Sequence, residues 1–418
     1  MVALGAMGLA ACSGDDEGGD SGSGDKVTMQ FWHNATTGPG KAFWDKTVAD
    51  FQTANPNVTI KIQQVQNEDL DGKLQTALNS GSAPDIFLQR GGGKMAAMVE
   101  AGQLKDVTGD ISDATKSAVG AALGTGQVDG KQYAVPVSIL PGGFWYSKDL
   151  FQKAGVTAPP TTLEELSAAV TKLKAINAPI ALGAKDAWPA AHWYYFLALR
   201  ACNQASLDAA AKDKNFSDPC WTKAGEDLKT FADTKPFNEG FLTTSAQQGA
   251  GSSAGLVANY KASMELMGAW DPGVIASLTK DTKPLPDLGF FPFPAVPGGQ
   301  GDPAAIMGGA DGYSCSAQAP KACSDFLNYI VTKDVQEGYY KAFNSLPISK
   351  EAQGAVTEDY LKAVLDAYNK APYVSQWLDT IYGQNVGNAL NVGVVNLLAG
   401  KGDVAGIIQA VNDAAKKG

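Results

Sequence analysis

The chain has 418 residues, which is too long for one small core and predicts two or three compact units. Hydrophobic residues make up 44% and charged residues 18% of it, which excludes a wholly disordered chain and a coiled coil. Lys and Arg number 33 against 43 Asp and Glu, a formal net charge of −10, and no lysine run offers a surface for phosphates, so we expect no nucleic-acid partner.

The N-terminal segment predicts an exported, anchored protein. Residues 1–11 are apolar but far shorter than the ~20 residues of a membrane-spanning helix. Leu9-Ala10-Ala11-Cys12 resembles a bacterial lipobox, in which the chain is cut before the cysteine and its thiol carries diacylglycerol. Residues 13–25 are rich in Gly, Ser and Asp and read as a flexible tether. We therefore predict a signal peptide over residues 1–12 and lipidation at Cys12; the alternative is a chance Ala-rich start.

Beyond Cys12 the chain holds four cysteines, an even number that can pair completely in an oxidising compartment. Pairing between neighbours in sequence is the simplest of three connectivities and joins Cys202 to Cys220 and Cys315 to Cys323. The alternative is four buried thiols.

From residue 26 the pattern alternates strands and helices. Residues 27–33 read as a strand, and the helix that follows ends at Asn55-Pro56. Residues 58–65 read as a second strand, residues 67–80 as a helix and residues 85–88 as a third strand. This order predicts a mostly parallel α/β sheet.

A second α/β segment follows. Residues 143–146, 264–267 and 288–293 read as strands, and Thr162-Leu-Glu-Glu165 has the spacing of a capping box that opens a helix. From about residue 320 onward the pattern is almost entirely helical.

The motifs that suggest catalysis or metal binding each lack a residue that the chemistry requires. Residues 251–255 spell G-x-S-x-G, but no strand precedes them and no histidine follows, so we expect a surface loop. Residues 67–72 resemble the start of a calcium loop, but Leu78 occupies the position of the bidentate glutamate. The two histidines lie far apart and no C-x-x-C pair or P-loop occurs, so we expect no metal, no cofactor and no catalytic residue.

Tryptophan is the most suggestive residue type. Several of the eight lie at predicted strand ends or at the starts of helices, and ligands of parallel α/β sheets bind beyond the carboxyl ends of the strands. An aromatic face suits the flat C–H face of a sugar. The alternative for any one tryptophan is packing in a core.

Seven stretches in the same order resemble family 1 extracellular solute-binding proteins of bacterial ABC importers, the maltose-binding-protein-like group. They span the chain from about residue 27 to the C-terminal helices and read FQTANPNVTIKI, SGSAPDIFL, VDGKQYAVPV, WYSKDLFQKAGV with APPTTLEEL, KASMELMGAW, GGADGYS and LPIS.

The resemblance implies a two-lobed α/β fold of the periplasmic-binding-protein type (type II), with a ligand cleft between hinge-linked lobes. The N-terminal lobe is expected over residues 26–138 and 309–345, and the C-terminal lobe over residues 139–308 and 346–418. The resemblance further implies a receptor that captures a carbohydrate, closes by hinge bending and delivers it to the membrane permease and its ATPase.

The resemblance also implies which residues contact the ligand. Trp270 occupies the tryptophan position of an M-x-x-x-G-x-W pattern, where a ring commonly stacks on a sugar, and Arg90 offers a planar fork for vicinal hydroxyls or a uronate. One of Trp188 and Trp193 is expected to face the ligand, since they are five residues apart across a helix start. The remaining candidates are His33, Asn34, Gln89, Asp271, Asp311 and Tyr313.

We therefore expect a lipid-anchored, monomeric carbohydrate receptor on the outer face of a cell membrane, and the Gly/Ala richness with the long tether indicates a Gram-positive cell. Two alternatives remain open at this point. One is a secreted glycoside hydrolase that uses paired carboxylates. The other is the same receptor fold with a polyol, a glycerophosphodiester or another non-sugar solute.

Overall fold

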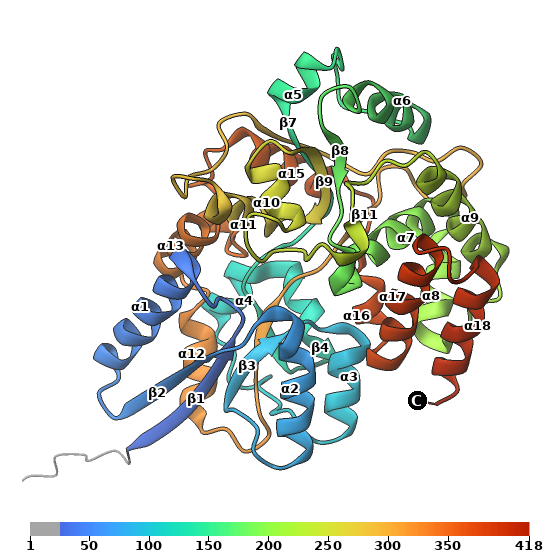
Figure 1. Cartoon of the computed structure of the whole chain (residues 1–418). Helices are drawn as coiled ribbons and strands as arrows, with labels where there is room; N and C mark the ends of the chain where they lie inside the picture. Colours follow the sequence, from blue (N-terminus) through green and yellow to red (C-terminus); the bar gives the residue numbers. More distant parts are fainter. Residues whose placement is uncertain (1–25, 418) are drawn as a thin grey trace, which may run out of the picture.

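The computed structural model describes residues 26–417. The predicted signal peptide, the tether and Cys12 lie outside the described residues. The chain forms two lobes, each built around its own β-sheet (Figure 1). Among residues 26–417, no helix combines the length and the apolar character needed to cross a membrane.

The first lobe contains a five-stranded sheet in the order β2-β1-β3-β12-β6. Its strands are β1 (Val27–His33), β2 (Val58–Gln64), β3 (Ile86–Gln89), β6 (Ala134–Pro136) and β12 (Gly312–Cys315). Its helices are α1 (Gly38–Ala54), α2 (Asn67–Asn79), α3 (Gly92–Glu100), α4 (Asp113–Val119), α12 (Lys321–Tyr329), α13 (Lys333–Phe343) and α14 (Lys350–Gln353). A short hairpin, β4 (Gln127–Val128) with β5 (Lys131–Gln132), follows the 3-10 helix η1 (Gly120–Gly126).

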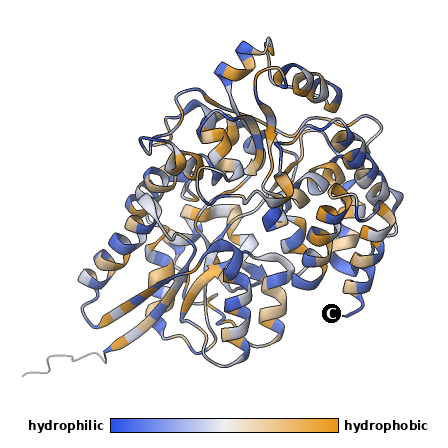
Figure 2. Ribbon diagram, in the orientation of Figure 1, coloured by the Kyte–Doolittle hydropathy of each residue, from blue (hydrophilic) through white to orange (hydrophobic). Residues whose placement is uncertain are grey.

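Aromatic side chains fill the core of this lobe. Phe31 of β1 meets Trp44, Tyr313 and Phe326 edge-on, with ring centroids 5.1–5.4 Å apart. Apolar residues recur along each packed helix as the sequence pattern predicts, and Figure 2 shows hydrophobic and hydrophilic residues alternating along the outer helices.

The second lobe contains a four-stranded sheet in the order β10-β7-β9-β8. Its strands are β7 (Gly142–Ser147), β8 (Ala178–Ala181), β9 (Ala262–Gly268) and β10 (Leu288–Phe291), and β11 (Ile306–Gly308) pairs with β13 (Val374–Gln376) beside it. Its helices are α5 (Lys148–Lys153), α6 (Leu163–Leu173), α7 (Trp188–Ala201), α8 (Gln204–Asp213), α9 (Pro219–Asp233), α10 (Ser253–Ala258), α11 (Asp271–Leu278), α15 (Asp359–Lys370), α16 (Leu378–Ile381), α17 (Gln384–Leu398) and α18 (Val404–Ala415), with 3-10 helices η2 (Ala184–Asp186) and η3 (Phe241–Thr243).

The expectation of a mostly parallel sheet is wrong beyond the first three strands. Strand β1 pairs in parallel with β2 and β3, as the β-α-β order requires. Strand β12 is antiparallel to both of its neighbours, and β7 is antiparallel to β9 and β10. The reason is that these strands enter from the other lobe rather than from a helical crossover, so both sheets are mixed.

Three chain segments carry the backbone between the lobes. One runs from α14 of the first lobe to α15 of the second, and the other two are hydrogen-bonded to each other. Leu140 N donates to Gly309 O at 2.9 Å, and Gly309 N donates to Leu140 O at 3.3 Å. Val137 N donates to Asp311 O at 2.9 Å, and Ile348 N in turn donates to Val137 O at 3.3 Å. We call residues 137–141 with residues 309–311 the hinge strands.

The lobe boundaries expected from the sequence stay a prediction. The strands of each sheet fall within the ranges assigned to their lobe. Helix α14 contacts α4 and α13 of the first lobe, although the prediction assigned residues from 346 onward to the second lobe.

The two sequence motifs have structural explanations. Thr162 caps α6, and its side chain accepts from Glu165 N at 3.2 Å, which confirms the predicted helix start. The G-x-S-x-G serine, Ser253, is not on a surface loop as expected. It is buried at the start of α10, where its hydroxyl donates to Ala246 O at 3.0 Å.

The predicted local cysteine pairing is confirmed, because the structure contains the disulfides Cys202–Cys220 and Cys315–Cys323. The first links the end of α7 to the start of α9, and the second links β12 to α12. The first therefore joins two helices on either side of α8, and the second joins a strand to the helix that follows it.

Removal of the first disulfide tests its contribution to stability. It closes a loop with a sequence separation of 18, so the paired substitution Cys202→Ser and Cys220→Ser should lower the free energy of unfolding by about 3 kcal/mol. Urea denaturation followed by circular dichroism measures this loss. An unchanged midpoint in the double variant would show that the cross-link does not restrict the unfolded chain.

Candidate functional site

Four rings gather where strands and helices of the second lobe meet, and we call them the aromatic cluster. Trp188 begins α7, Trp270 follows β9 and Trp377 follows β13. His192 lies one turn along α7 and stacks on Trp377 with ring centroids 4.4 Å apart. Trp270 lies 5.6 Å from Trp377 and 6.1 Å from Trp188, so three separate segments contribute to one aromatic surface.

Glycines give the rings room beside the backbone. A Cβ on Gly268 would lie 2.0 Å from the Trp270 ring, so the glycine of the M-x-x-x-G-x-W pattern is required for the ring to fold back across the end of β9. A Cβ on Gly142 would lie 2.7 Å from the Trp377 ring. Because Gly268 and Gly142 have no side chain, the Trp270 and Trp377 rings can pack directly against the backbone at these positions.

The aromatic cluster is uncharged and has unused hydrogen-bonding atoms. Burial lowers the pKa of His192 to about 3, so the imidazole is neutral at physiological pH. The indole nitrogens of Trp188 and Trp270 and the Nδ1 atom of His192 have no hydrogen-bond partner among the described residues. These polar atoms are buried, whereas the Trp188 and Trp270 side chains are partly exposed and suit the C–H faces of a ligand.

The first lobe presents polar side chains at the edge where β1 and β3 end and β12 begins. Arg90 donates through Nη2 to Asn67 Oδ1 at 2.7 Å and through Nε to Asp71 Oδ1 at 3.2 Å, and its Nη1 lies 3.5 Å from Asp311 Oδ2. Asn34 Nδ2 also donates to Asn67 Oδ1, at 3.2 Å. We call these residues, with Lys94, the polar network.

Charges within the polar network balance. Lys94 Nζ lies 2.7 Å from Asp71 Oδ2, so Asp71 contacts two cations. Although burial opposes its ionisation, the charges of Arg90 and Lys94 lower the pKa of Asp71. Burial likewise opposes the charge on Arg90, and Asp71 and Asp311 outweigh it and raise the pKa of Arg90. The guanidinium is already engaged by residues of its own lobe, which counts against the expectation that it binds a uronate.

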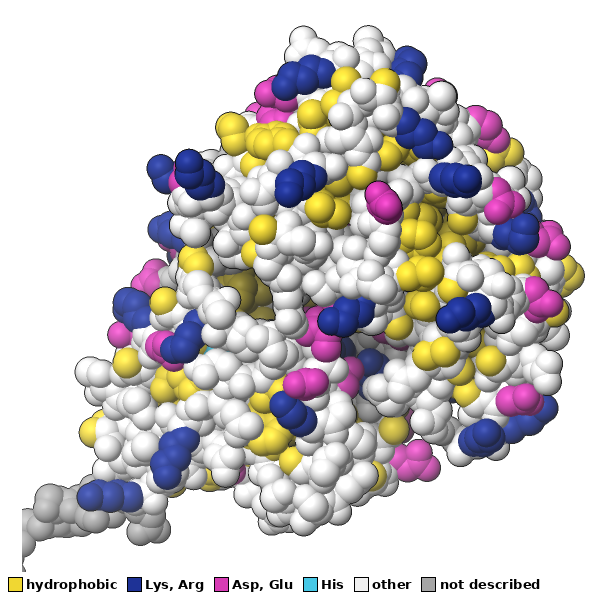
Figure 3. All heavy atoms as spheres, in the orientation of Figure 1, with side chains coloured by type: hydrophobic (Ala, Val, Ile, Leu, Met, Phe, Trp, Pro, Cys, Tyr) yellow, Lys and Arg dark blue, Asp and Glu magenta, His cyan; other side chains and the backbone are white. Residues whose placement is uncertain are grey.

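The aromatic cluster and the polar network adjoin across the two lobes. Gln376, immediately before Trp377, donates through Nε2 to Arg90 O at 3.4 Å. On the hinge strands, Gly309 approaches the Trp377 ring and Asp311 approaches Arg90. Figure 3 shows a recess in the surface at the level where the lobes meet, with hydrophobic side chains inside it.

The structure buries five of the expected residues away from this site. Trp193 is buried in the core of the second lobe and stacks on Phe231 with centroids 5.0 Å apart. Tyr313 is buried in the first lobe against Phe31. Trp188 is therefore the one of the two tryptophans that can face a ligand, and the burial of Tyr313 counts against a contact between its ring and the ligand.

His33 is also buried, and it packs on Trp44 with ring centroids 5.8 Å apart. Its Nδ1 accepts from Ala35 N at 3.2 Å, and burial lowers the pKa of the ring to about 4. Gln89 is buried as well, and its Oε1 accepts from Arg90 N at 2.9 Å and from Gly91 N at 3.2 Å. Both side chains hold the strand ends in place rather than point to a ligand.

Asp271 lies directly after Trp270 but is fully buried, and it faces Glu265 of β9 rather than open space. The carboxylate oxygens of both residues lack a donor among the described residues. Burial raises the pKa of Asp271 to about 8, and burial together with Asp271 raises that of Glu265. The pair therefore retains a proton near neutral pH.

Sequence reasoning did not select Trp377, His192, Asn67, Asp71 or Lys94 as site residues. Trp377 was one of the tryptophans at element junctions, and residues 67–72 stood out only as an incomplete calcium loop. No sequence spacing links α7, β13 and α2, so their convergence depends on the tertiary fold.

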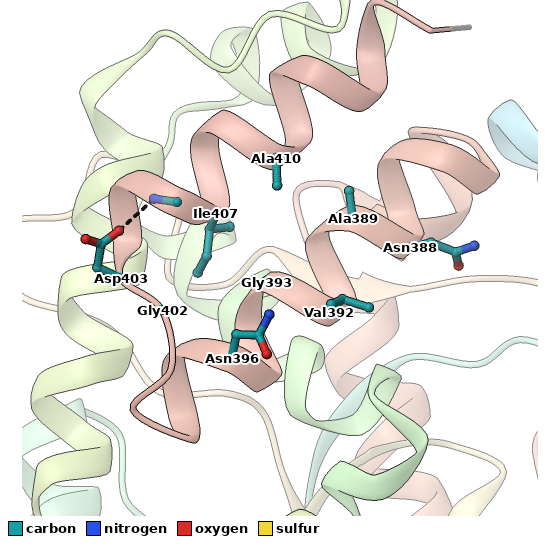
Figure 4. A pocket seen from close by; sticks show the side chains of 10 residues that line it. Asn388, Ala389, Val392, Gly393, Asn396, Gly402, Asp403, Ile407 and Ala410 are labelled. Atoms are coloured by element: carbon teal, nitrogen blue, oxygen red, sulfur yellow. Dashed lines mark hydrogen bonds between the residues drawn. The ribbon is translucent and has the colours of Figure 1, made fainter.

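Other features of the described surface do not form a site. Among residues 26–417, no group of three or more His, Cys, Asp or Glu side chains is placed to hold a metal ion. A groove of about 430 Å³ lies between α17 and α18 (Figure 4). Asp403 lies on its edge and accepts a hydrogen bond from Gly406 N at 2.8 Å. This carboxylate therefore caps the N-terminus of α18.

Comparison with known proteins gives a consistent relationship. The family model described as bacterial extracellular solute-binding protein matches residues 34–337. The diacetylchitobiose binding protein DasA of Streptomyces coelicolor is 25% identical over 90% of this chain and 89% of its own length. A solved chitin oligosaccharide binding protein superposes with a TM-score of 0.85 at 25% identity, covering 94% of this chain and 99% of that one. A binding protein of Brucella abortus is 29% identical, but the match covers only 39% of this chain and 40% of that protein.

The buried carboxyl pair predicts a pH-dependent difference in stability. Unfolding exposes Glu265 to water, where it loses its proton above its ordinary pKa, so rising pH favours the unfolded state by up to about 1.4 kcal/mol per pH unit for one proton. Glu265→Gln should remove this term and become progressively more stable than the parent between about pH 5 and pH 8.

Urea denaturation at several pH values measures this difference, and the buried histidines contribute equally to both proteins. The exposed Glu100→Gln serves as the matched control and should show a constant difference. A constant difference for Glu265→Gln as well would show that the pair holds no extra proton.

Proposed function

Because the chain belongs to the bacterial extracellular solute-binding protein family, we propose that it captures a carbohydrate between its lobes for an ABC importer. The ligand is a di- or oligosaccharide, and the closed, loaded form is the one that docks on the membrane permease. The observation that carries this proposal is that the aromatic cluster of one lobe adjoins the polar network of the other.

The two halves of the site suit the two kinds of surface on a sugar ring. The Trp270 and Trp377 rings provide apolar area for stacking on C–H faces. Asn34 and the carboxylates of the polar network provide hydrogen-bonding groups for hydroxyls. Two relatives in the comparison are named for binding chitin-derived oligosaccharides, which supports the same ligand class.

The charge balance of the site favours an uncharged sugar. Arg90 and Lys94 are each paired with a carboxylate, and His192 is neutral. A phosphate or carboxylate on the ligand would compete with Asp71 or Asp311 for the same cations and would leave that aspartate partly buried without its partner.

Capture without catalysis is the reading that the site supports. A glycoside hydrolase needs two carboxyl groups that reach the scissile bond. Glu265 and Asp271 are fully buried, and Asp71 is neutralised by two cations. Ser253 has its hydroxyl bonded to the backbone.

We further propose that Cys12 carries the lipid that anchors a monomeric receptor to the outer face of the membrane of a Gram-positive cell. The support is the lipobox-like sequence before Cys12 and the polar segment after it. Labelling of the expressed full chain with a fatty-acid analogue, and loss of that label in Cys12→Ser, would establish the modification.

A thermal-shift screen identifies the ligand. The panel contains xylo-, cello-, chito-, malto- and galacto-oligosaccharides, their monosaccharides, and amino-acid, polyol and phosphate controls. A sugar present at about 100 times its dissociation constant should add about 2.7 kcal/mol of stability. A rise in melting temperature with one oligosaccharide series is expected, whereas a rise only with a polyol or a phosphate ester would replace the sugar in this proposal.

Trp270→Ala tests the stacking role. Removal of a central ring that contacts ligand should weaken sugar binding about 30-fold or more, as measured by isothermal titration calorimetry. Trp270→Phe keeps part of the aromatic face and should lose less. Equal affinity in the parent and in the folded alanine variant would rule out stacking on this ring.

A further inference from the structure

Three consecutive glycines link the polar network to the opposite lobe. Gly91, Gly92 and Gly93 follow Arg90 and begin α3, and they lie against residues 376–383 of the second lobe, which include α16. Figure 1 shows α16 directly beside α3 at the boundary between the lobes.

The contact brings backbone against backbone. A Cβ on Gly93 would lie 2.6 Å from Ile381 O and 2.9 Å from Gly383 N. A Cβ on Gly92 would lie 2.9 Å from Thr380 O. Backbone atoms cannot move aside as a flexible side chain can, so no residue larger than glycine fits here without separating the lobes.

Gly93 differs from Gly91 and Gly92 in its backbone conformation, which makes it the suitable position for a substitution. Gly91 and Gly92 have φ angles of 76° and 59°, in the left-handed region that favours glycine, whereas Gly93 does not have a positive φ. At Gly93 only the approach of the other lobe requires a glycine. A substitution there perturbs the contact between lobes without straining its own backbone.

We propose that Gly91–Gly93 and residues 376–383 form a latch that engages only when the lobes close around a ligand. The inference rests on the proposed function, since it assigns the closing contact of that receptor. The latch adjoins both halves of the site, because Arg90 precedes the glycines and Trp377 lies within the docked segment. A ligand that draws the polar network and Trp377 together thereby seats α3 on α16.

The latch brings backbone against backbone, unlike the side-chain contact that α2 makes with the second lobe. Gln248 Nε2 also reaches Glu68 Oε2 at 3.1 Å, but this pair joins two exposed side chains and adds little to closure. The glycine contact is closely packed. Because dispersion attraction falls steeply with distance, this contact stabilises the protein only when the lobes are close together. The contact therefore lowers the free energy of the closed state relative to the open state.

The test compares Gly93→Ala with Gly72→Ala. Gly72 lies on α2 in the same lobe, and an added Cβ there meets no atom within 4 Å. The parent and both variants are taken through the same oligosaccharide panel by thermal shift. Gly93→Ala should need about tenfold more of the active sugar for the same shift, while Gly72→Ala matches the parent.

The other outcomes separate the latch from the receptor function. Equal sugar responses in all three proteins would overturn the latch and leave the proposed function intact. A lower melting temperature of Gly93→Ala without sugar would also overturn it, because the contact would then be permanent. Failure of every sugar to stabilise the parent would overturn the proposed function and the latch together.

Discussion

The paired backbone hydrogen bonds between Leu140 and Gly309 fix how the two lobes meet. Both hinge strands pass through this point and lead toward the site: Gly142, beside the Trp377 ring, follows one, and Asp311 lies at the end of the other. Because these hydrogen-bonded strands bend more readily than they slide past one another, the lobes can change their separation while the aromatic cluster and the polar network stay aligned. The hinge strands therefore determine how the aromatic cluster and the polar network face each other.

Electrostatics within the site follow from burial. The partly buried cations of the first lobe are each neutralised by an aspartate, and the buried histidine of the second lobe is neutral. Such a surface gains little from a charged ligand and much from one that offers hydroxyls and apolar faces. Because the charges of the site are paired within the protein, we expect it to recognise its ligand by shape and hydrogen bonding rather than by charge.

The sequence predicts the fold more fully than the site. Local signals such as the 27–33 strand and the Thr162 cap locate elements within a few residues, and the glycine pattern locates Trp270. The antiparallel strands escaped prediction because their direction depends on chain crossings between lobes. Trp188 and Trp193 lie five residues apart on α7, and tertiary packing around Phe231 places one in the core while the other lies beside Trp270.

Small-angle X-ray scattering of the purified protein, with and without the sugar that stabilises it, tests the central claim most directly. A ligand held between the lobes should reduce the radius of gyration of the protein, because sugar contacts to both lobes favour the closed arrangement. Saturation with a bound sugar at an unchanged radius of gyration would contradict capture by closure and would place the ligand on one lobe alone.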